Sequence, residues 1–297
     1  MSYGHVTLLP DRGLVEVQGP DAPVFLQDLV TNDVESIKPG EGMFAGLLTP
    51  QGKILCDFLI YMRDPQSYWL DCMRDQAETI AKRLSMYKLR AKADIVNRSG
   101  ELAVGAAWGE MPGGADDAFL ASYDDPRYAP LGARFVIASS VAEPASLAAA
   151  TSSSATAYHS RRISLAIPQG GLDYAYGEAF PHEACFDELH GVDFDKGCYV
   201  GQEVVSRMHH RGIAKTRIAA IETSEPLDIV GAEIRAGEFP VGTLGSMDGT
   251  QGIAMLRLDR IEEAARHGIP LRVGETIVVA RTPPWASYSV PSGKVAI

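Results

Sequence analysis

Residues 43–64, "MFAGLLTPQGKILCDFLIYMRD", contain two apolar, strand-like runs on either side of the turn sequence "TPQG". Turn residues between two such runs predict a β-hairpin. A further strand is expected at residues 67–72, "SYWLDC". The next segment, "RDQAETIAKRLSMYKLRAK", predicts a helix capped at Asp75, because apolar residues recur at helical spacing at Ala77, Ile80, Ala81, Leu84 and Tyr87. A hairpin and strand followed by a helix indicate an α+β fold for this part of the chain.

The residues before the hairpin fit the same class. Residues 14–19, "LVEVQG", alternate between apolar and polar side chains and predict a strand. The following "PDAPVFLQDLVTND" can form a short helix with Asp21 as its cap and Pro23 in its first turn. Farther along, residues 141–157, "VAEPASLAAATSSSATA", are rich in Ala and Ser. That composition is compatible with a flexible linker and with a helix, and both alternatives stay open.

The pattern of apolar and turn residues changes after Arg211. Short strand-like runs with Gly turns recur at regular spacing: "TRIAAIET", "AEIRA", "FPVGTLGSM", "GIAMLRL" and "ETIVVAR". The helix-like run "LDRIEEAARHG" interrupts them, with Asp259 as the expected N-cap and Gly268 as the expected C-cap. This pattern predicts a small antiparallel barrel or sandwich. We therefore expect an α+β region of two interleaved subdomains at residues 1–212 and a C-terminal β-barrel at residues 213–297.

The composition limits the class of protein. The 297-residue chain is 46% apolar and 22% charged, as is usual for a soluble globular protein. Its net charge of −11 argues against a broad nucleic-acid-binding surface, which would need positive charge. No apolar stretch approaches the ~18 residues of a transmembrane helix. The N-terminal "MSYGHVTLLPDRG" resembles neither a signal peptide nor a transit peptide, so a cytoplasmic location without membrane contact is expected.

The four cysteines do not form a metal or redox motif. None of them belongs to a CxxC pair, and we expect no metal site. Cys56 and Cys72 lie in apolar, strand-like runs, and Cys185 has no partner at a usual metal-ligand spacing. These three are expected to be buried structural residues. Cys198 stands in a different context, within "DFDKGCYVGQEVVSRMHHRG" at residues 193–212.

Two features of that stretch favour a reactive Cys198. A helix starting at "YVGQEVVSRM" would place the thiol near a helix N-terminus, whose dipole stabilises a thiolate. Lys196 adds a positive charge two residues away, and Gln202 would share the face of Cys198. The alternative, that Cys198 is one more buried apolar residue, stays open.

A group of basic residues follows the thiol. Glu203 is rotated away from Cys198 and is expected to pair with Tyr199 or with Arg207. No acidic residue occurs at residues 207–217, which contain Arg207, Arg211, Lys215 and Arg217. This run suits a carboxylate tail or the acidic surface of a partner, and it also suits a solvated strand end.

The run "KGCYVGQE" resembles the signature of the YgfZ family, folate-binding proteins in the wider group that contains the T-protein of the glycine cleavage system. A mitochondrial iron–sulfur assembly factor is the eukaryotic branch. Four other segments resemble this family, namely "FLQDLVTNDV" (25–34), "LLTPQGKILCDFLIY" (47–61), "RRISLAIP" (161–168) and "VVSRMHHRG". The family usually has Gly in place of Ala166. The resemblance covers most of the first 215 residues, and the barrel matches in texture more than in motif.

The resemblance implies a T-protein-like fold, in which α+β parts and a β-barrel surround an opening that takes tetrahydrofolate. It also implies assembly or repair of iron–sulfur enzymes, including those that thiolate tRNA, with folate as a helper. Cys198 would be the functional thiol, with Lys196, Gln202 and Glu203 of the same signature as its assisting residues. The implied partners are folate and iron–sulfur client or assembly proteins.

The hairpin departs from the T-protein pattern. That pattern usually has a Gly-Gly turn followed by an Asp-Asp pair, whereas this chain has Gly52-Lys53 and then Cys56-Asp57. One carboxylate is therefore missing, which argues against aminomethyl transfer. A folate-dependent aminomethyltransferase and a non-catalytic interaction scaffold are the two alternative functions, and whether the protein is an enzyme stays open.

The resemblance also supplies folate-binding candidates. Arg and Lys can hold the carboxylates of a folate tail, and Asp or Asn can hydrogen-bond the pterin edge. The candidates are Asn32, Asp33, Lys53, Asp57, Arg90 and Arg207. Each of them also fits an ordinary turn or surface residue, and "TND" in particular is a good turn sequence.

Overall fold

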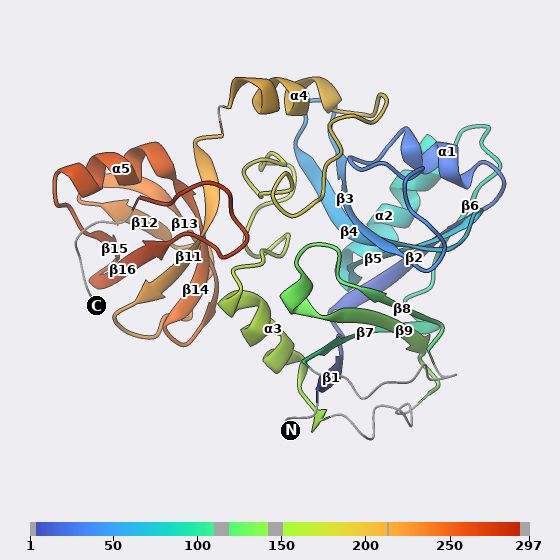
Figure 1. The fold of residues 1–297 in the computed structure, drawn as a ribbon, viewed down its shortest axis with the longest axis horizontal. Coiled ribbons are helices and arrows are strands. Elements are labelled where there is room, and N and C mark those ends of the chain that lie inside the picture. Colours follow the sequence, from blue (N-terminus) through green and yellow to red (C-terminus); the bar gives the residue numbers. More distant parts are fainter. Residues whose placement is uncertain (1–3, 110–118, 142–150, 213, 292–297) are drawn as a thin grey trace. The chain divides into compact units, whose positions relative to one another are not determined.

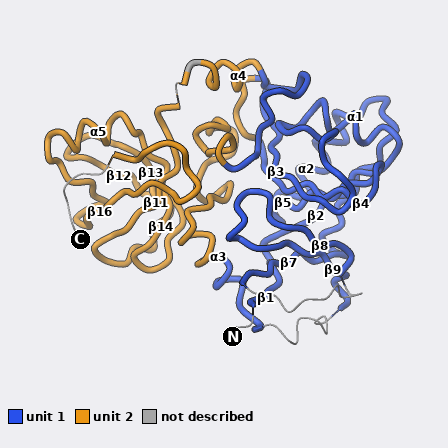
Figure 2. Tube along the Cα trace, in the orientation of Figure 1, with its two compact units in different colours: residues 1–50, 55–158, 189–202 blue, residues 51–54, 159–188, 203–297 orange. Residues whose placement is uncertain are grey.

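The computed structural model describes residues 4–109, 119–141, 151–212 and 214–291. Contacts within the chain divide it into two compact units, which Figure 2 shows in different colours. The first unit contains residues 1–50, 55–158 and 189–202, and the second contains residues 51–54, 159–188 and 203–297. The domain boundary expected near residue 213 stays a prediction.

The first unit contains two five-stranded sheets (Figure 1). One has the strand order β3 (Gly42–Leu48), β4 (Ile54–Asp64), β5 (Ser67–Met73), β2 (Arg12–Gln18) and β6 (Asp94–Asn97). Its helices are α1 (Ala22–Gln27) and α2 (Arg74–Tyr87). The pairs β4–β5, β2–β5 and β2–β6 are antiparallel. These elements confirm the strands expected at both arms of the hairpin and at residues 67–72, and the short helix after Asp21.

Apolar side chains of this sheet and its helices form the core. On α2, Ala77, Ile80, Ala81 and Leu84 are buried, as the helical spacing predicts. Tyr87 was expected on the same side, but it is the last helical residue and is 37% exposed. The expected cap at Asp75 is also wrong. Because α2 follows β5 directly, Met73 is the N-cap and Asp75 lies in the first turn.

The second sheet has the order β10 (Thr151–Ser152), β1 (His5–Leu8), β7 (Leu102–Trp108), β9 (Ala133–Ala138) and β8 (Ala121–Asp124). Its pairs are antiparallel except for β1–β10. The 3₁₀ helix η1 (Ala129–Leu131) precedes β9. Within the Ala- and Ser-rich segment, residues 142–150 lie outside the described residues, and the remainder forms β10 and the start of α3 (Ala155–Ser164).

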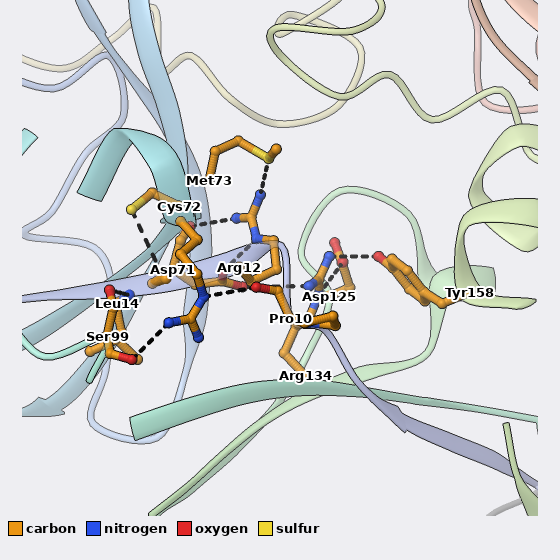
Figure 3. Close-up of polar contacts among 12 residues, drawn as sticks. Pro10, Arg12, Leu14, Asp71, Cys72, Met73, Ser99, Asp125, Arg134 and Tyr158 are labelled. Carbon is orange, nitrogen blue, oxygen red and sulfur yellow. Dashed lines mark hydrogen bonds and ion pairs between the residues drawn. The ribbon is translucent and has the colours of Figure 1, made fainter. Parts of the chain in front are cut away.

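A buried ion network connects the strands of the first unit (Figure 3). Arg12 Nε donates to Asp71 Oδ1 at 2.6 Å, and Arg134 lies 3.5 Å from Asp71 Oδ2 and 3.2 Å from Asp125 Oδ2. Arg127 forms two hydrogen bonds to Asp125, at 2.9 and 2.7 Å. Burial alone would raise the pKa of Asp125, but the two guanidinium groups beside it lower that pKa instead. The Asp125 carboxylate therefore stays ionised inside the unit.

The second unit contains a closed barrel with the order β11 (Thr216–Thr223), β14 (Gln251–Arg257), β13 (Phe239–Asp248), β12 (Glu233–Ala236), β15 (Leu271–Val273) and β16 (Thr276–Arg281). All six pairings between neighbouring strands are antiparallel, and β11–β16 closes the ring. α5 (Leu258–Arg266) follows β14, with its N-cap at Arg257, two residues before the expected Asp259. Its C-cap is His267, so Gly268 follows the cap with a φ of 66°. Antiparallel sheets with a few helices and a closed barrel confirm the expected α+β class.

Candidate functional site

Cys198 is exposed, whereas the other three cysteines are buried. Cys56, Cys72 and Cys185 are at most 4% exposed, as their sequence context predicts. Burial raises the pKa of Cys72 to about 12 and that of Cys185 to about 11. Such thiols stay protonated at neutral pH and react slowly. Exposure therefore makes Cys198 the candidate reactive thiol, because a buried structural role does not apply to it.

The thiol lies in an irregular segment, residues 189–201, which we call the signature loop. α4 (Gln202–Arg211) begins only after Gly201. Gly201 has a φ of 87°, a left-handed conformation that cannot continue an α-helix. The expectation that a helix begins next to Cys198 is therefore wrong, and Gln202 is the first residue of α4 rather than a neighbour one turn away.

Lys196 is buried in the signature loop, and its ammonium group faces main-chain oxygens. Nζ donates to the carbonyl oxygens of Gln27, Val30 and Asn32 at 2.8, 2.7 and 2.8 Å. Gln27 ends α1, where carbonyl groups have no partner inside the helix. All three ammonium hydrogens are thus used, and none remains for the Cys198 thiol. Burial lowers the pKa of Lys196 to about 8.

The signature loop also binds the TND turn, residues 31–33, through other hydrogen bonds. Thr31 Oγ1 donates to the Gly191 oxygen at 2.6 Å, and the Asp193 N–H donates to the Thr31 oxygen at 3.1 Å. The Asp193 carboxylate then accepts from the Lys196 N–H at 2.9 Å. The two segments, far apart in sequence, are therefore joined through main-chain and side-chain bonds within the first unit.

Asn32 and Asp33 of the TND turn use their side chains to hold this arrangement. Asn32 Nδ2 donates to the oxygens of Phe44 and His190, at 2.8 and 2.7 Å. Its Oδ1 accepts from the Asp33 N–H at 2.9 Å. Asp33 Oδ1 accepts from Gln27 Nε2 at 2.7 Å and from the Glu35 N–H at 3.1 Å. The structure therefore brings Asn32, Asp33 and Lys196 together.

Tyr199 holds the other side of the thiol. Its side chain is 8% exposed, and Lys196 Nζ lies 5.1 Å from its ring centroid. Val200 packs against the apolar core of the first unit. Between the buried residues Lys196 and Tyr199, only Gly197 and Cys198 are exposed. The thiol therefore stands on a two-residue tip with a buried side chain on each side.

The remaining signature residues lie on α4. Glu203 Oε1 accepts from Arg207 Nη2 at 2.6 Å, which selects Arg207 over Tyr199 as its partner. Both side chains are more than half exposed, so this pair contributes little to stability. Gln202 is half-buried at the start of the helix.

The other folate candidates are dispersed. Asp57 is buried in β4, and its charge is close enough to help raise the pKa of Arg12, although burial opposes that shift. Arg90 is exposed beyond the end of α2. In the second unit, Lys53 Nζ lies 5.7 Å from the ring centroid of Phe180.

The basic run at residues 207–217 is compensated by acids of the same chain. Arg217 donates to Asp187 Oδ1 at 2.7 Å, and Lys215 lies 3.5 Å from Asp259 Oδ2. Arg207 forms an ion pair with Glu203, as described above. The side chain of Arg211 lies outside the described residues. Sequence spacing could not reveal these pairs, because two of the three acids are distant along the chain.

Sequence reasoning missed the ion network and a histidine pair. The signal for the network was available, because Asp71 and Arg134 interrupt otherwise apolar strand sequences.

In the second unit, the ring of buried His182 lies 6.2 Å from that of His209 on α4. Burial lowers the pKa of His182.

Two features are absent from the described residues, a cluster of metal ligands and a membrane-spanning helix. No group of three or more His, Cys, Asp or Glu side chains there could hold a metal ion. No helix in those ranges has the length and apolar character that crossing a membrane requires.

Comparison with known proteins connects both parts of the chain to characterised domains. Residues 11–110 match the GCVT N-terminal domain, and residues 215–288 match the CAF17 C-terminal beta-barrel domain. The solved structure of glycine cleavage system aminomethyltransferase T from Bartonella henselae superposes with a TM-score of 0.75. It covers 97% of this chain and 88% of that one at 15% identity, which shows a shared fold.

Curated relatives are named as iron–sulfur cluster assembly factor IBA57. The Mus musculus protein is 31% identical over 307 residues, which cover 93% of this chain and 84% of the mouse protein. The Neurospora crassa protein is 33% identical over 230 residues, or 72% of this chain. That match spans about half of the fungal protein, 52% of its length.

The relatives also correct one sequence-based expectation and refine another. Their names describe them as mitochondrial, which contradicts the expected cytoplasmic location. That expectation rested on the absence of a recognisable leader, and such an absence does not locate a protein. The matches are to CAF17 and IBA57 proteins, to which the expected YgfZ family is related. Similarity to the mouse protein over 93% of this chain, together with the two domain matches, shows that the chain belongs to the CAF17/IBA57 family.

Proposed function

We propose that this protein supports the assembly or repair of iron–sulfur cluster enzymes, with Cys198 as its working thiol. The relatives' names support the general role. The observation that carries the residue assignment is the exposure of Cys198 on a tip between two buried side chains, while the other three thiols are buried. Enzymes that thiolate tRNA are among the proposed clients.

The chemistry of a single thiol suits transient handling of a cluster. A thiolate is the ligand that iron–sulfur clusters prefer, and a complete cluster site usually uses four ligands. One thiolate from this chain leaves the remaining positions to a partner or client. The cluster is then cargo that this protein shares and releases. The Lys196 clamp, defined as Lys196 with its three carbonyl partners, would keep the thiol in one place during that exchange.

Tetrahydrofolate is the second proposed ligand, and the candidate residues fit it unequally. Asn32 fits poorly, because both hydrogens of its amide already bind carbonyl groups. Arg207 is engaged by Glu203, and Asp33 accepts hydrogen bonds from Gln27 and Glu35. Asp57 stays a candidate as a carboxylate for the pterin, and Lys53 or Arg90 as a cation for the tail. Calorimetry with tetrahydrofolate polyglutamate should give saturable binding, and no heat together with no thermal stabilisation would refute it.

Aminomethyl transfer is the alternative that the shared fold with aminomethyltransferase T favours. Cys56 opposes it, because this residue stands where the transferase pattern has a carboxylate. Burial raises the pKa of Cys56 so far that the thiol stays protonated. A neutral thiol cannot replace a charged carboxylate as a proton acceptor or as a partner of a cationic intermediate.

The decisive test of the proposed function is complementation of cells that lack the protein. Cys198→Ala should fold normally, because this side chain is exposed, and should fail to restore the activity of cluster-dependent enzymes. Asp195→Asn, also exposed in the signature loop, is the matched control and should restore it. Full activity with Cys198→Ala would favour the interaction scaffold instead.

A further inference from the structure

The end of α2 carries an exposed surface whose apolar side chains have no part in the proposed function. Met86, Tyr87 and Leu89 are 68%, 37% and 88% exposed, although all three side chains are large and apolar. Residues 79–93 contain no acidic residue and include the basic residues Lys82, Arg83, Lys88, Arg90 and Lys92. We call residues 82–92 the basic-apolar surface. Exposed apolar side chains surrounded by charge are typical of protein interaction sites.

The backbone of Leu89 adds an independent observation. Leu89 has a φ of 43° and directly follows Lys88, the C-cap of α2. Gly or Asn usually occupies this left-handed position, and a leucine there costs roughly 1–2 kcal/mol. The 88% exposed side chain gains no core packing that would offset the cost. The stability of the free protein therefore does not explain leucine at this position, whereas a contact with a partner does.

The charges of this surface select the chemistry of the partner. Lys82 lies 3.2 Å from Glu78, and Lys88 lies 3.5 Å from Asp94, but both pairs are largely in solvent. Arg90 and Lys92 form no ion pair with any residue in the described ranges. The whole chain has a net charge of −11, so most of its surface repels an acidic protein. A local positive surface would steer such a protein to this one place.

We propose that the basic-apolar surface docks an acidic partner protein. Met86 and Leu89 would be covered by apolar side chains of the partner, and Lys88 and Lys92 would meet its carboxylates at the rim. Met, Tyr and Arg are enriched in such interfaces, and a charged rim around an apolar centre is their usual anatomy. This inference goes beyond the proposed function and does not depend on Cys198.

The test uses a fluorescent helical peptide with Glu and Leu at helical spacing as the acidic probe, and fluorescence anisotropy as the readout. Binding to the full chain should saturate and should weaken as salt screens the charges. Leu89→Asn should weaken binding about tenfold or more, as expected for an apolar centre residue. Its Tm should be unchanged or higher, because Asn tolerates the left-handed conformation better than Leu. Lys92→Glu should weaken binding by up to about fivefold.

Two controls and a membrane alternative complete the test. Phe239→Ser removes a 71% exposed aromatic side chain from the second unit, and Cys198→Ala removes the thiol. Both variants should bind the probe as the unmodified protein does. Vesicles of phosphatidylcholine and phosphatidylserine should not bind. The proposal is overturned if the probe does not bind saturably, if Leu89→Asn and Lys92→Glu bind it normally, or if the vesicles bind through this surface instead.

Discussion

Two regions of the first unit bury positive charge, and they neutralise it in different ways. In the ion network, Arg134 faces the carboxylates of Asp71 and Asp125. Burial alone would lower the pKa of Arg134, but its surroundings, including Asp71, raise it. In the Lys196 clamp, the ammonium group faces three carbonyl dipoles, and burial lowers the pKa of Lys196 to about 8.

The difference shows how the two regions are suited to different tasks. Paired full charges keep their ionisation over the whole physiological pH range and hold the strands of the unit together. Carbonyl dipoles are weaker partners, so the clamp holds the signature loop with a strength that changes near pH 8. The ion network and the Lys196 clamp therefore differ in how their electrostatic stabilisation depends on pH.

The largest effect is expected from breaking the ion network. Arg134→Met should lower the free energy of unfolding by about 3–5 kcal/mol, because it removes the buried cation that Asp71 and Asp125 share and leaves each carboxylate with a single guanidinium partner. Arg266→Met makes the same chemical change at an exposed i, i+4 pair with Glu262 and should cost less than about 1 kcal/mol. Urea denaturation measures both. Equal losses in the two variants would show that the network does not hold the unit together.

A smaller effect is expected from removing the clamp. Lys196→Met should cost about 1–3 kcal/mol, because the carbonyls of Gln27, Val30 and Asn32 lose their donor. Limited proteolysis should then cut within residues 189–201 sooner than in the unmodified protein. Lys82→Met, at an exposed helical pair, serves as the control. The clamp has no structural role if both lysine variants resist protease and urea equally well.

The smallest effect is a pH dependence that separates the two regions. The pKa of Lys196 is about 8 in the folded protein and returns to its ordinary value near 10.5 on unfolding. Between these values the unfolded chain binds more protons, so stability rises with pH. The unmodified protein should therefore gain stability relative to Lys196→Met as the pH increases from about 8 to 10.5. Arg134→Met should show the same slope as the unmodified protein, and parallel curves for Lys196→Met would contradict the buried ammonium.

The sequence predicted the fold better than it predicted the site. Periodicity and turn residues identified the hairpin, the α2 core face and the closed barrel, because local patterns determine those elements. The run "KGCYVGQE" predicted Cys198 as the functional thiol, and the exposure of this residue agrees with the prediction. The orientation of Lys196 could not be predicted, because its partners at residues 27–32 lie more than 160 positions away. The left-handed Gly201, which separates the thiol from α4, also has no unique signal in the sequence.

The central claim is that the signature loop presents Cys198 as the reactive thiol of this chain. Competing alkylation with limiting iodoacetamide, followed by peptide mapping, tests it most directly. In the folded protein near neutral pH, Cys198 should be modified first, and Cys56, Cys72 and Cys185 should react only after unfolding in urea. Modification of any of those three before Cys198 in the folded protein would contradict the account.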